Sequence, residues 1–196
     1  MKPLYFCLLA FAFCLVFSAC RPAAAPVSVT NQPISINDIP NKNLPMPPKK
    51  PLGEMRWTKF DGKTNADGDD QRLDDLKGKV VILDFWATYC APCLEEIPHL
   101  NELQTKHNSK GFEVIGLHVG GEEDRPKVPE FAEKLKINYT LATPEIALES
   151  FIFYQDTSIP QTLVLDREGK LVERFVGFDS ETKNDLDKAV EKAFSQ

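Results

Sequence analysis

Cysteine is scarce in this sequence, and its few copies are unevenly placed. The 196 residues hold five cysteines, of which three lie near the start of the chain and two, Cys90 and Cys93, lie in its body. A small secreted domain held together by disulfides would have more cysteines, spread along the chain. One close pair instead indicates redox or metal chemistry.

The sequence also lacks an excess of positive charge. Its 23 lysines and arginines are outnumbered by 29 aspartates and glutamates, which gives a formal net charge of -6. A nucleic-acid-binding domain would show a basic patch, so no nucleic acid partner is expected. Hydrophobic residues make up 42% of the chain, enough for a packed core in one ordinary domain.

Charge is almost missing from the start of the chain, where Lys2 is the only charged side chain before Arg21. The apolar run from Leu4 to Phe17 is shorter than the roughly 20 residues that span a bilayer, so residues 1–19 fit an export signal. The signal ends in Phe-Ser-Ala-Cys20, which resembles a bacterial lipobox, and this resemblance implies that Cys20 is lipidated. Ordinary signal cleavage nearby and an uncleaved anchor are the alternatives.

A proline-rich stretch follows the signal. Residues 21 to 52 hold eight prolines and few large apolar side chains. Such a composition favours extended, solvated backbone and cannot build a core. Residues 20–52 are therefore expected to be a tether between the membrane and a folded domain of residues 53–196.

The folded part alternates strand and helix patterns. Strands and helices in alternation favour parallel pairing with right-handed crossovers, and a closing hairpin adds antiparallel pairs. We therefore expect an α/β fold whose mixed sheet has helices on both faces. The expected elements are a strand Arg56–Phe60, a loop Asp61–Asp70, a strand Lys79–Ala87, a helix from the cysteines to His107, a strand Phe112–Val119, a helix with Val128, Phe131, Ala132 and Leu135 on one face, a hairpin of Thr162–Asp166 and Lys170–Val176, and a last helix through Leu186, Ala189, Val190, Ala193 and Phe194.

The Cys-X-X-Cys pair lies where a buried strand passes into a helix. Cys90 falls at the helix start, where free N–H groups and the helix dipole favour a thiolate, the form that attacks disulfides. We therefore expect Cys90 to be exposed. Cys93, one turn further, should be shielded but close enough to resolve the mixed disulfide. Pro92 suits the first turn, where no N–H is needed.

A zinc knuckle or a structural disulfide is the alternative interpretation of this pair. Structural zinc needs four ligands, usually from a second close pair, and the sequence has no such pair. His99 would lie on the opposite helix face from Cys90, His107 is several turns away, and packing explains His118. We therefore expect no metal and no cofactor beyond a redox-active disulfide.

The segment Trp86-Ala-Thr-Tyr-Cys-Ala-Pro-Cys93 resembles the active site of the thioredoxin superfamily. More specifically, residues 54 to 194 resemble the membrane-tethered TlpA/ResA/CcmG group of extracytoplasmic thiol–disulfide reductases. The resemblance implies a thioredoxin fold and a cis peptide at Ile159-Pro160, which would turn the backbone of Ile159 toward the cysteines to pair with substrate. Trp86, Ile159 and Pro160 are thus expected to bind substrate, although Trp86 could simply pack beside the site.

Two carboxylates complete the expected site. Asp84 interrupts an apolar strand, where an unpaired charge is costly, and it matches the buried carboxylate of thioredoxin. Glu96 matches an acidic residue of the ResA-like group, and its spacing places it beside Cys93 on the helix surface. We expect Asp84 to be the main acceptor of the Cys93 proton, with Glu96 tuning the thiols from the surface. A strand-edge Asp84 and a solvated Glu96 are the alternatives.

The resemblance implies an enzyme that reduces disulfides in cysteine-containing exported proteins, including the haem-attachment cysteines of cytochrome c. It also implies a monomer, reduced by a membrane thiol donor of the DsbD/CcdA kind, outside the cytoplasm (on the periplasmic side in a Gram-negative host). A disulfide oxidant or isomerase and a non-enzymatic copper(I)-binding module remain open. A peroxidase would want threonine at position 87, where alanine stands, and copper(I) carriers of the Sco type space their cysteines more widely.

Overall fold

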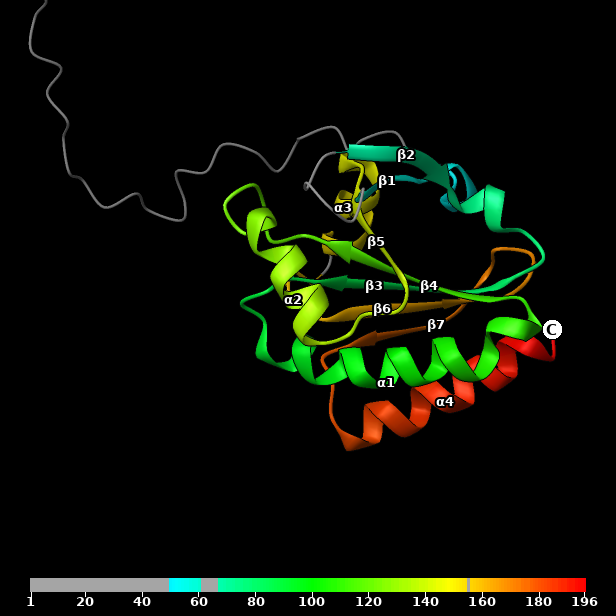
Figure 1. Ribbon diagram of the computed structural model, residues 1–196. Coiled ribbons are helices and arrows are strands. Elements are labelled where there is room, and N and C mark those ends of the chain that lie inside the picture. The colour runs from blue at the N-terminus through cyan, green and yellow to red at the C-terminus, as the bar shows by residue number, and fades with distance from the viewer. Residues whose placement is uncertain (1–49, 61–66, 155) are drawn as a thin grey trace, which may run out of the picture. The chain divides into compact units, whose positions relative to one another are not determined.

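The computed structural model of the protein describes residues 50–60, 67–154 and 156–196 (Figure 1). The expected signal, the lipidation site Cys20 and most of the tether lie outside these residues. Among the described residues, no helix is both long and apolar enough to cross a membrane.

A single mixed sheet organises the described part of the chain. Its strands run in the order β2-β1-β5-β4-β3-β6-β7. β3 is parallel to β4, and β4 is parallel to β5, whereas the pairs β3–β6, β6–β7, β1–β2 and β1–β5 are antiparallel. The strands are β1 (Arg56–Phe60), β2 (Asp67–Arg72), β3 (Val80–Trp86), β4 (Phe112–His118), β5 (Thr140–Pro144), β6 (Gln161–Leu165) and β7 (Leu171–Val176).

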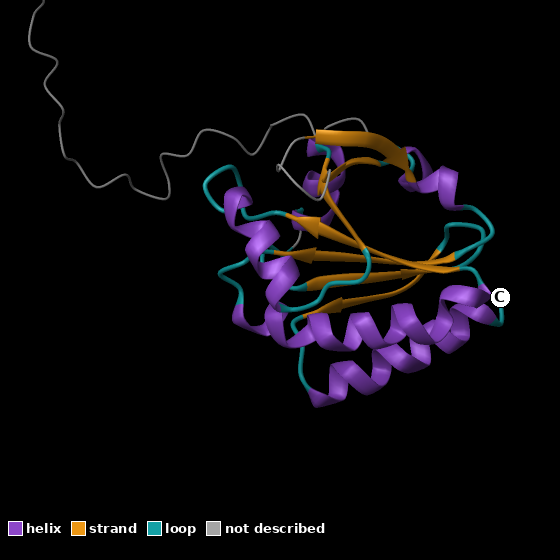
Figure 2. Ribbon diagram, in the orientation of Figure 1, coloured by secondary structure: helices purple, strands orange, loops and turns teal. Residues whose placement is uncertain are grey.

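Helices cover both faces of this sheet. α1 and α4 lie along one face, and α3 lies on the other (Figures 1 and 2). The α-helices are α1 (Ala91–His107), α2 (Val128–Lys134), α3 (Ile146–Phe153) and α4 (Ser180–Phe194), and the 3-10 turns are η2 (Leu52–Glu54), η3 (Leu73–Leu76), η4 (Asn108–Lys110) and η5 (Arg125–Lys127). This arrangement confirms the α/β class with a mixed sheet that the sequence predicts.

The central strand β3 explains how the core is divided. Every residue of β3 is buried, as its continuous apolar run predicts. Val80 and Ile82 pack against α1 and α4, whereas Val81, Leu83 and Phe85 belong to the cluster that contains α3. Because side chains alternate along a strand, Asp84 shares the face of Ile82 and points toward the layer of α1.

The polar segment 61–70 was expected to be a loop, and its last four residues belong to a strand instead. β2 starts at Asp67 and pairs antiparallel with β1, with Arg56 opposite Arg72. Among the strands that the structure describes, β2 lies at the sheet edge and pairs with β1 alone, so it needs no apolar alternation to form. The pairing with β1, which the residues of β2 do not reveal by themselves, decides its conformation.

The expected element order also omits β5 and α3. β5 fits between β1 and β4 in the sheet, and α3 follows it directly. β5 contains two threonines and a proline, a composition without a clear strand period. α3 is apolar almost throughout, so no helical stripe distinguishes it from a buried strand.

Candidate active site

The two cysteines form a disulfide at the start of α1. Cys90 is the N-cap residue of the helix and is bonded to Cys93. The backbone N–H of Cys93 donates a hydrogen bond to the Cys90 sulfur at 3.3 Å. The sulfur of Cys90 therefore lies at the free N–H groups of the first turn, as the thiolate-stabilising role requires.

Access to the two sulfurs is unequal, although Cys90 is less exposed than the sequence suggests. Cys90 is 7% exposed and Cys93 only 1%. The expected open exposure of Cys90 is wrong in extent because the disulfide packs in a cluster with Trp86 and Ile159. Cys90 is still the more accessible residue of the pair.

The loop before β6 carries the expected cis peptide. The bond between Ile159 and Pro160 is cis, and Ile159 packs in the same cluster as the two cysteines. The side-chain amide of Gln161 supports this loop by donating to the carbonyls of Asp156 and Ser158, both at 2.8 Å. The loop and the cysteines, about 70 residues apart in sequence, thus meet at one site, as the resemblance implied.

Trp86 lies under this site rather than on its surface. Its side chain is fully buried and packs with Cys90, Cys93 and the edge of the His118 ring. The expected contact of Trp86 with substrate is therefore corrected to a packing role. Tyr89, which directly precedes Cys90, is 67% exposed.

Both carboxylates are buried, and Glu96 lies in α1 three residues after Cys93. Asp84 and Glu96 are each 1% exposed, so the expected surface position of Glu96 is wrong. Thr162 donates a hydrogen bond from its hydroxyl to Glu96 at 2.6 Å, and Thr162 also lies opposite Asp84 in the β3–β6 pair. One threonine two residues beyond the cis proline thus bonds to Glu96 and lies opposite Asp84. The neighbouring Glu95 remains exposed.

The surroundings of these acids favour their protonated forms. Burial, followed by the nearby Glu96, raises the pKa of Asp84 well above its usual range. Burial also raises the pKa of Glu96 to about 7, against a smaller opposing effect of the hydrogen bond from Thr162. Neither oxygen of Asp84 has a hydrogen-bond partner among the described residues. Both shifts favour the protonated, uncharged forms of the two acids.

A tyrosine that the sequence does not single out completes this buried group. Burial, then Asp84 and Glu96, raise the pKa of Tyr139 well above its usual range, so its phenol stays protonated. Gly116, which is opposite Asp84 in β4, makes room for the ring: a Cβ there would lie 3.0 Å from Tyr139 Cε2 and 3.3 Å from Trp86 Nε1. Nothing in the local pattern around Tyr139 indicates this position.

The histidines do not gather around the cysteines. His99 and His107 face acidic residues of α4, at 3.1 Å from Asp187 and 3.8 Å from Glu191. His118 ends β4 and contacts Asp124. Among the described residues, no group of three or more histidine, cysteine or acidic side chains could hold a metal ion.

Comparison with known proteins identifies the family. A family model described as Redoxin matches residues 54–190. The chain belongs to the redoxin family.

Individual relatives of this redoxin carry names of the same activity. A thiol-disulfide oxidoreductase ResA of Bacillus cereus is 33% identical over 129 residues, which cover 66% of this chain and 72% of the relative. A putative thiol:disulfide interchange protein DsbE from Chlorobium tepidum is 25% identical with a TM-score of 0.61, covering 73% of this chain and 95% of that one. A thioredoxin family thiol:disulfide interchange protein from Chlorobium tepidum TLS is 28% identical with a TM-score of 0.59, covering 74% and 97%.

These likenesses confirm the expectation drawn from the active-site segment. The protein is a TlpA/ResA/CcmG-like member of the thioredoxin superfamily, and it is a thiol–disulfide oxidoreductase. The Cys90–Cys93 disulfide is its redox-active group.

Proposed function

We propose that this redoxin reduces disulfides in exported proteins outside the cytoplasm. The observation that carries the proposal is the buried pair of Asp84 and Glu96. A thiol–disulfide protein becomes a strong oxidant when its reduced, thiolate form is stabilised. When either acid is ionised, its negative charge disfavours a thiolate at the neighbouring cysteines, so the pair favours a protein that gives electrons away.

The reaction follows from the unequal access of the two sulfurs. The Cys90 thiolate attacks one sulfur of a substrate disulfide, a mixed disulfide forms, and the other substrate sulfur leaves as a thiolate. Cys93 then loses its proton and attacks the Cys90 sulfur. This second step releases the reduced substrate and forms the Cys90–Cys93 disulfide that the structure contains.

The proton of Cys93 has to leave in a place where charge is disfavoured. A general base works best when its pKa lies near the operating pH, and Glu96, with a pKa of about 7, meets this condition. Burial and the neighbouring Glu96 raise the pKa of Asp84 as well. The two acids therefore act as a pair in which Glu96 accepts the proton first, and this proposal reverses the order that the sequence favours.

Substrates are proposed to bind as an extended strand across the loop of Ile159 and Pro160, beside the exposed ring of Tyr89. Cysteine pairs of exported proteins are the substrate class, and the haem-attachment cysteines of cytochrome c are one instance. A membrane thiol donor of the DsbD/CcdA kind is proposed to reduce the Cys90–Cys93 disulfide after each turnover. The protein is proposed to work as a monomer.

The reduction potential tests the direction of the reaction. In a variant with Cys7, Cys14 and Cys20 replaced by serine, equilibration of Cys90 and Cys93 with glutathione buffers is expected to give a potential of about -270 mV or lower, as for thioredoxin. A potential near about -120 mV, typical of the oxidant DsbA, would show an oxidase instead. An intermediate value near about -180 mV would favour an isomerase.

The membrane anchor is tested by the variant Cys20→Ser in a bacterial host. We expect this variant to leave the membrane fraction or to accumulate with its signal uncleaved, because it lacks the thiol that carries lipid. The matched control is Cys14→Ser, which lies within the proposed signal and is expected to fractionate like the parent. Recovery of Cys20→Ser in membranes at the mature size would show that a lipid on Cys20 is not the anchor.

A further inference from the structure

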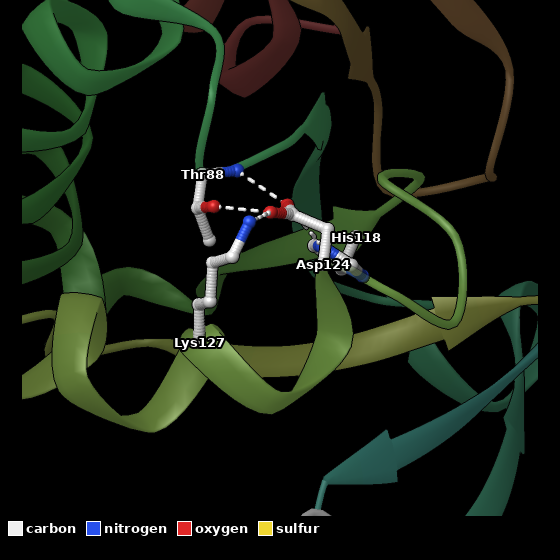
Figure 3. Close-up of polar contacts among 4 residues, drawn as sticks. All are labelled: Thr88, His118, Asp124 and Lys127. Atoms are coloured by element: carbon white, nitrogen blue, oxygen red, sulfur yellow. Dashed lines mark hydrogen bonds and ion pairs between the residues drawn. The ribbon is translucent and has the colours of Figure 1, made fainter.

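A buried carboxylate holds the segment that leads into Cys90. Asp124 follows β4, and its Oδ2 accepts the backbone N–H of Thr88 at 2.8 Å and lies 3.0 Å from His118 Nε2 (Figure 3). Its Oδ1 accepts the hydroxyl of Thr88 and the ammonium of Lys127, the latter at 3.1 Å. We call these four residues, Thr88, His118, Asp124 and Lys127, the Asp124 clasp.

The clasp satisfies the carboxylate completely and keeps it ionised. Burial alone would raise the pKa of Asp124, but the hydrogen bonds from Thr88, His118 and Lys127 together hold it well below its usual range. Burial lowers the pKa of His118, so this ring is neutral at pH 7 and donates its Nε2 proton to the carboxylate. Lys127 then balances the charge of Asp124, and the clasp places no net charge beside Cys90.

The chain leaves room for this arrangement at Gly120. A Cβ on Gly120 would overlap Asp124 Oδ2 and would lie 2.7 Å from His118 Nε2. Any side chain at this position would displace the two groups that meet there. The loop after β4 is therefore shaped by the carboxylate that it carries.

We propose that Asp124 and Thr88 are positioning residues that hold Cys90 at the start of α1 for its attack on disulfides. Only Tyr89 separates Thr88 from Cys90, and the Cys90 N–H closes the turn by donating to Ala87 O at 3.2 Å. In the oxidised protein the disulfide also fixes Cys90. In the reduced protein, which is the form that attacks, that covalent bond is gone, and the clasp holds the segment by both the backbone and the side chain of Thr88.

Thr88→Val tests the proposal without changing any charge. The variant keeps the backbone N–H bond to Asp124 and loses the hydroxyl bond. We expect reduced Thr88→Val to attack oxidised glutathione about tenfold more slowly, because a hydrogen bond to an ionised group is lost from the segment that places the sulfur. The pH midpoint of Cys90 alkylation is expected to move upward, since the thiolate loses its fixed place at the helix start.

Two further variants separate positioning from stability. Thr88→Ser keeps a hydroxyl and is expected to restore most of the rate. Gly120→Ala keeps every hydrogen-bonding group but pushes Asp124 and His118 aside, and it should slow attack in the same way. The matched control is Thr58→Val, which removes a similar hydroxyl-to-aspartate bond, 2.7 Å to Asp70, from the exposed β1–β2 pair.

Circular dichroism and thermal melts would establish that each variant is folded at the assay temperature. If the clasp served stability alone, disrupting it would lower the melting temperature. The rate of attack and the alkylation midpoint of the folded variant would then stay at the parent values. That result for Thr88→Val or Gly120→Ala would overturn the proposal. Equal slowing in Thr88→Ser and Thr88→Val would overturn it too, because the hydroxyl would then not matter.

Discussion

Cys93→Ala is expected to stop turnover and to trap the protein in covalent complexes with its substrates. Cys90 can still attack, but no second thiol remains to resolve the mixed disulfide. The loss should be at least about 10³-fold, since an intramolecular thiol acts at an effective concentration that free thiols cannot match. Non-reducing electrophoresis of the variant from cells should show bands above the size of the monomer, which disappear on addition of dithiothreitol.

Cys90→Ala is the matched control for this trap. Cys93 is 1% exposed and sits one turn inside α1, so in this variant a folded substrate disulfide meets no accessible sulfur. Turnover should be lost and no complexes should form. Equal trapping by the two variants would contradict the division of labour between the cysteines and would place the attacking sulfur at either position.

Patterns of residues close together in the sequence predict most of the fold and the reactive cysteine pair. The apolar run of β3, the helix that follows it and the β6–β7 hairpin each depend on residues close together in the chain, and all three are present. The Cys-X-X-Cys spacing likewise places one sulfur at a helix start and the other a turn away. These features are local, so a single sequence is enough to predict them.

The features that the sequence does not show depend on distant contacts. Helical spacing places Glu96, and not Glu95, on the face of Cys93 and Leu100, but the sequence does not show the bond from Thr162, 66 residues away, that Glu96 accepts there. Thr88 and Asp124 are 36 residues apart. The order of residue types along the chain does not show that these two residues meet. It also does not predict the polar strand β2, which forms because β1 lies beside it.

Asp84 is the exception, because a charge inside an apolar strand is visible in the sequence. Its burial follows from the strand, but its neighbours do not. In the structure, the neighbours of Asp84 are Thr162 from β6, Glu96 from α1 and the hydroxyl of Tyr139. Tyr139 was not predicted. The chemistry of the site therefore rests on a group of side chains from separate elements rather than on one residue.

Removing Asp84 should stabilise the protein in a pH-dependent way. The folded-state pKa of Asp84 is raised above its unfolded value of about 3.9, so the folded protein holds a proton that the unfolded chain releases. Its free energy of unfolding therefore falls as pH rises above about 4. Asp84→Asn has no such pH-dependent loss of stability. In urea unfolding, its free energy of unfolding should therefore exceed that of the parent by more at pH 8 than at pH 4.

The two acids are expected to differ in their effect on resolution of the mixed disulfide. In the parent, the rate of this step should rise with pH through about 7, as Glu96 becomes able to accept the Cys93 proton. Glu96→Gln should lose this rise and be about 10²-fold slower at pH 8, the lower end of what a positioned base contributes. Asp84→Asn should keep a midpoint near pH 7 and lose less than about tenfold.

Stopped-flow measurement of substrate release from a preformed mixed disulfide isolates this step, and Glu95→Gln is the matched control. Glu95 precedes Glu96 in the same helix and is exposed, so its removal changes the charge of α1 without touching the buried pair. If Asp84→Asn abolished the rise near pH 7 while Glu96→Gln kept it, Asp84 would be the acceptor. The site would then handle its proton as the sequence favours, with Glu96 as the tuning group, acting from a buried position instead of from the surface.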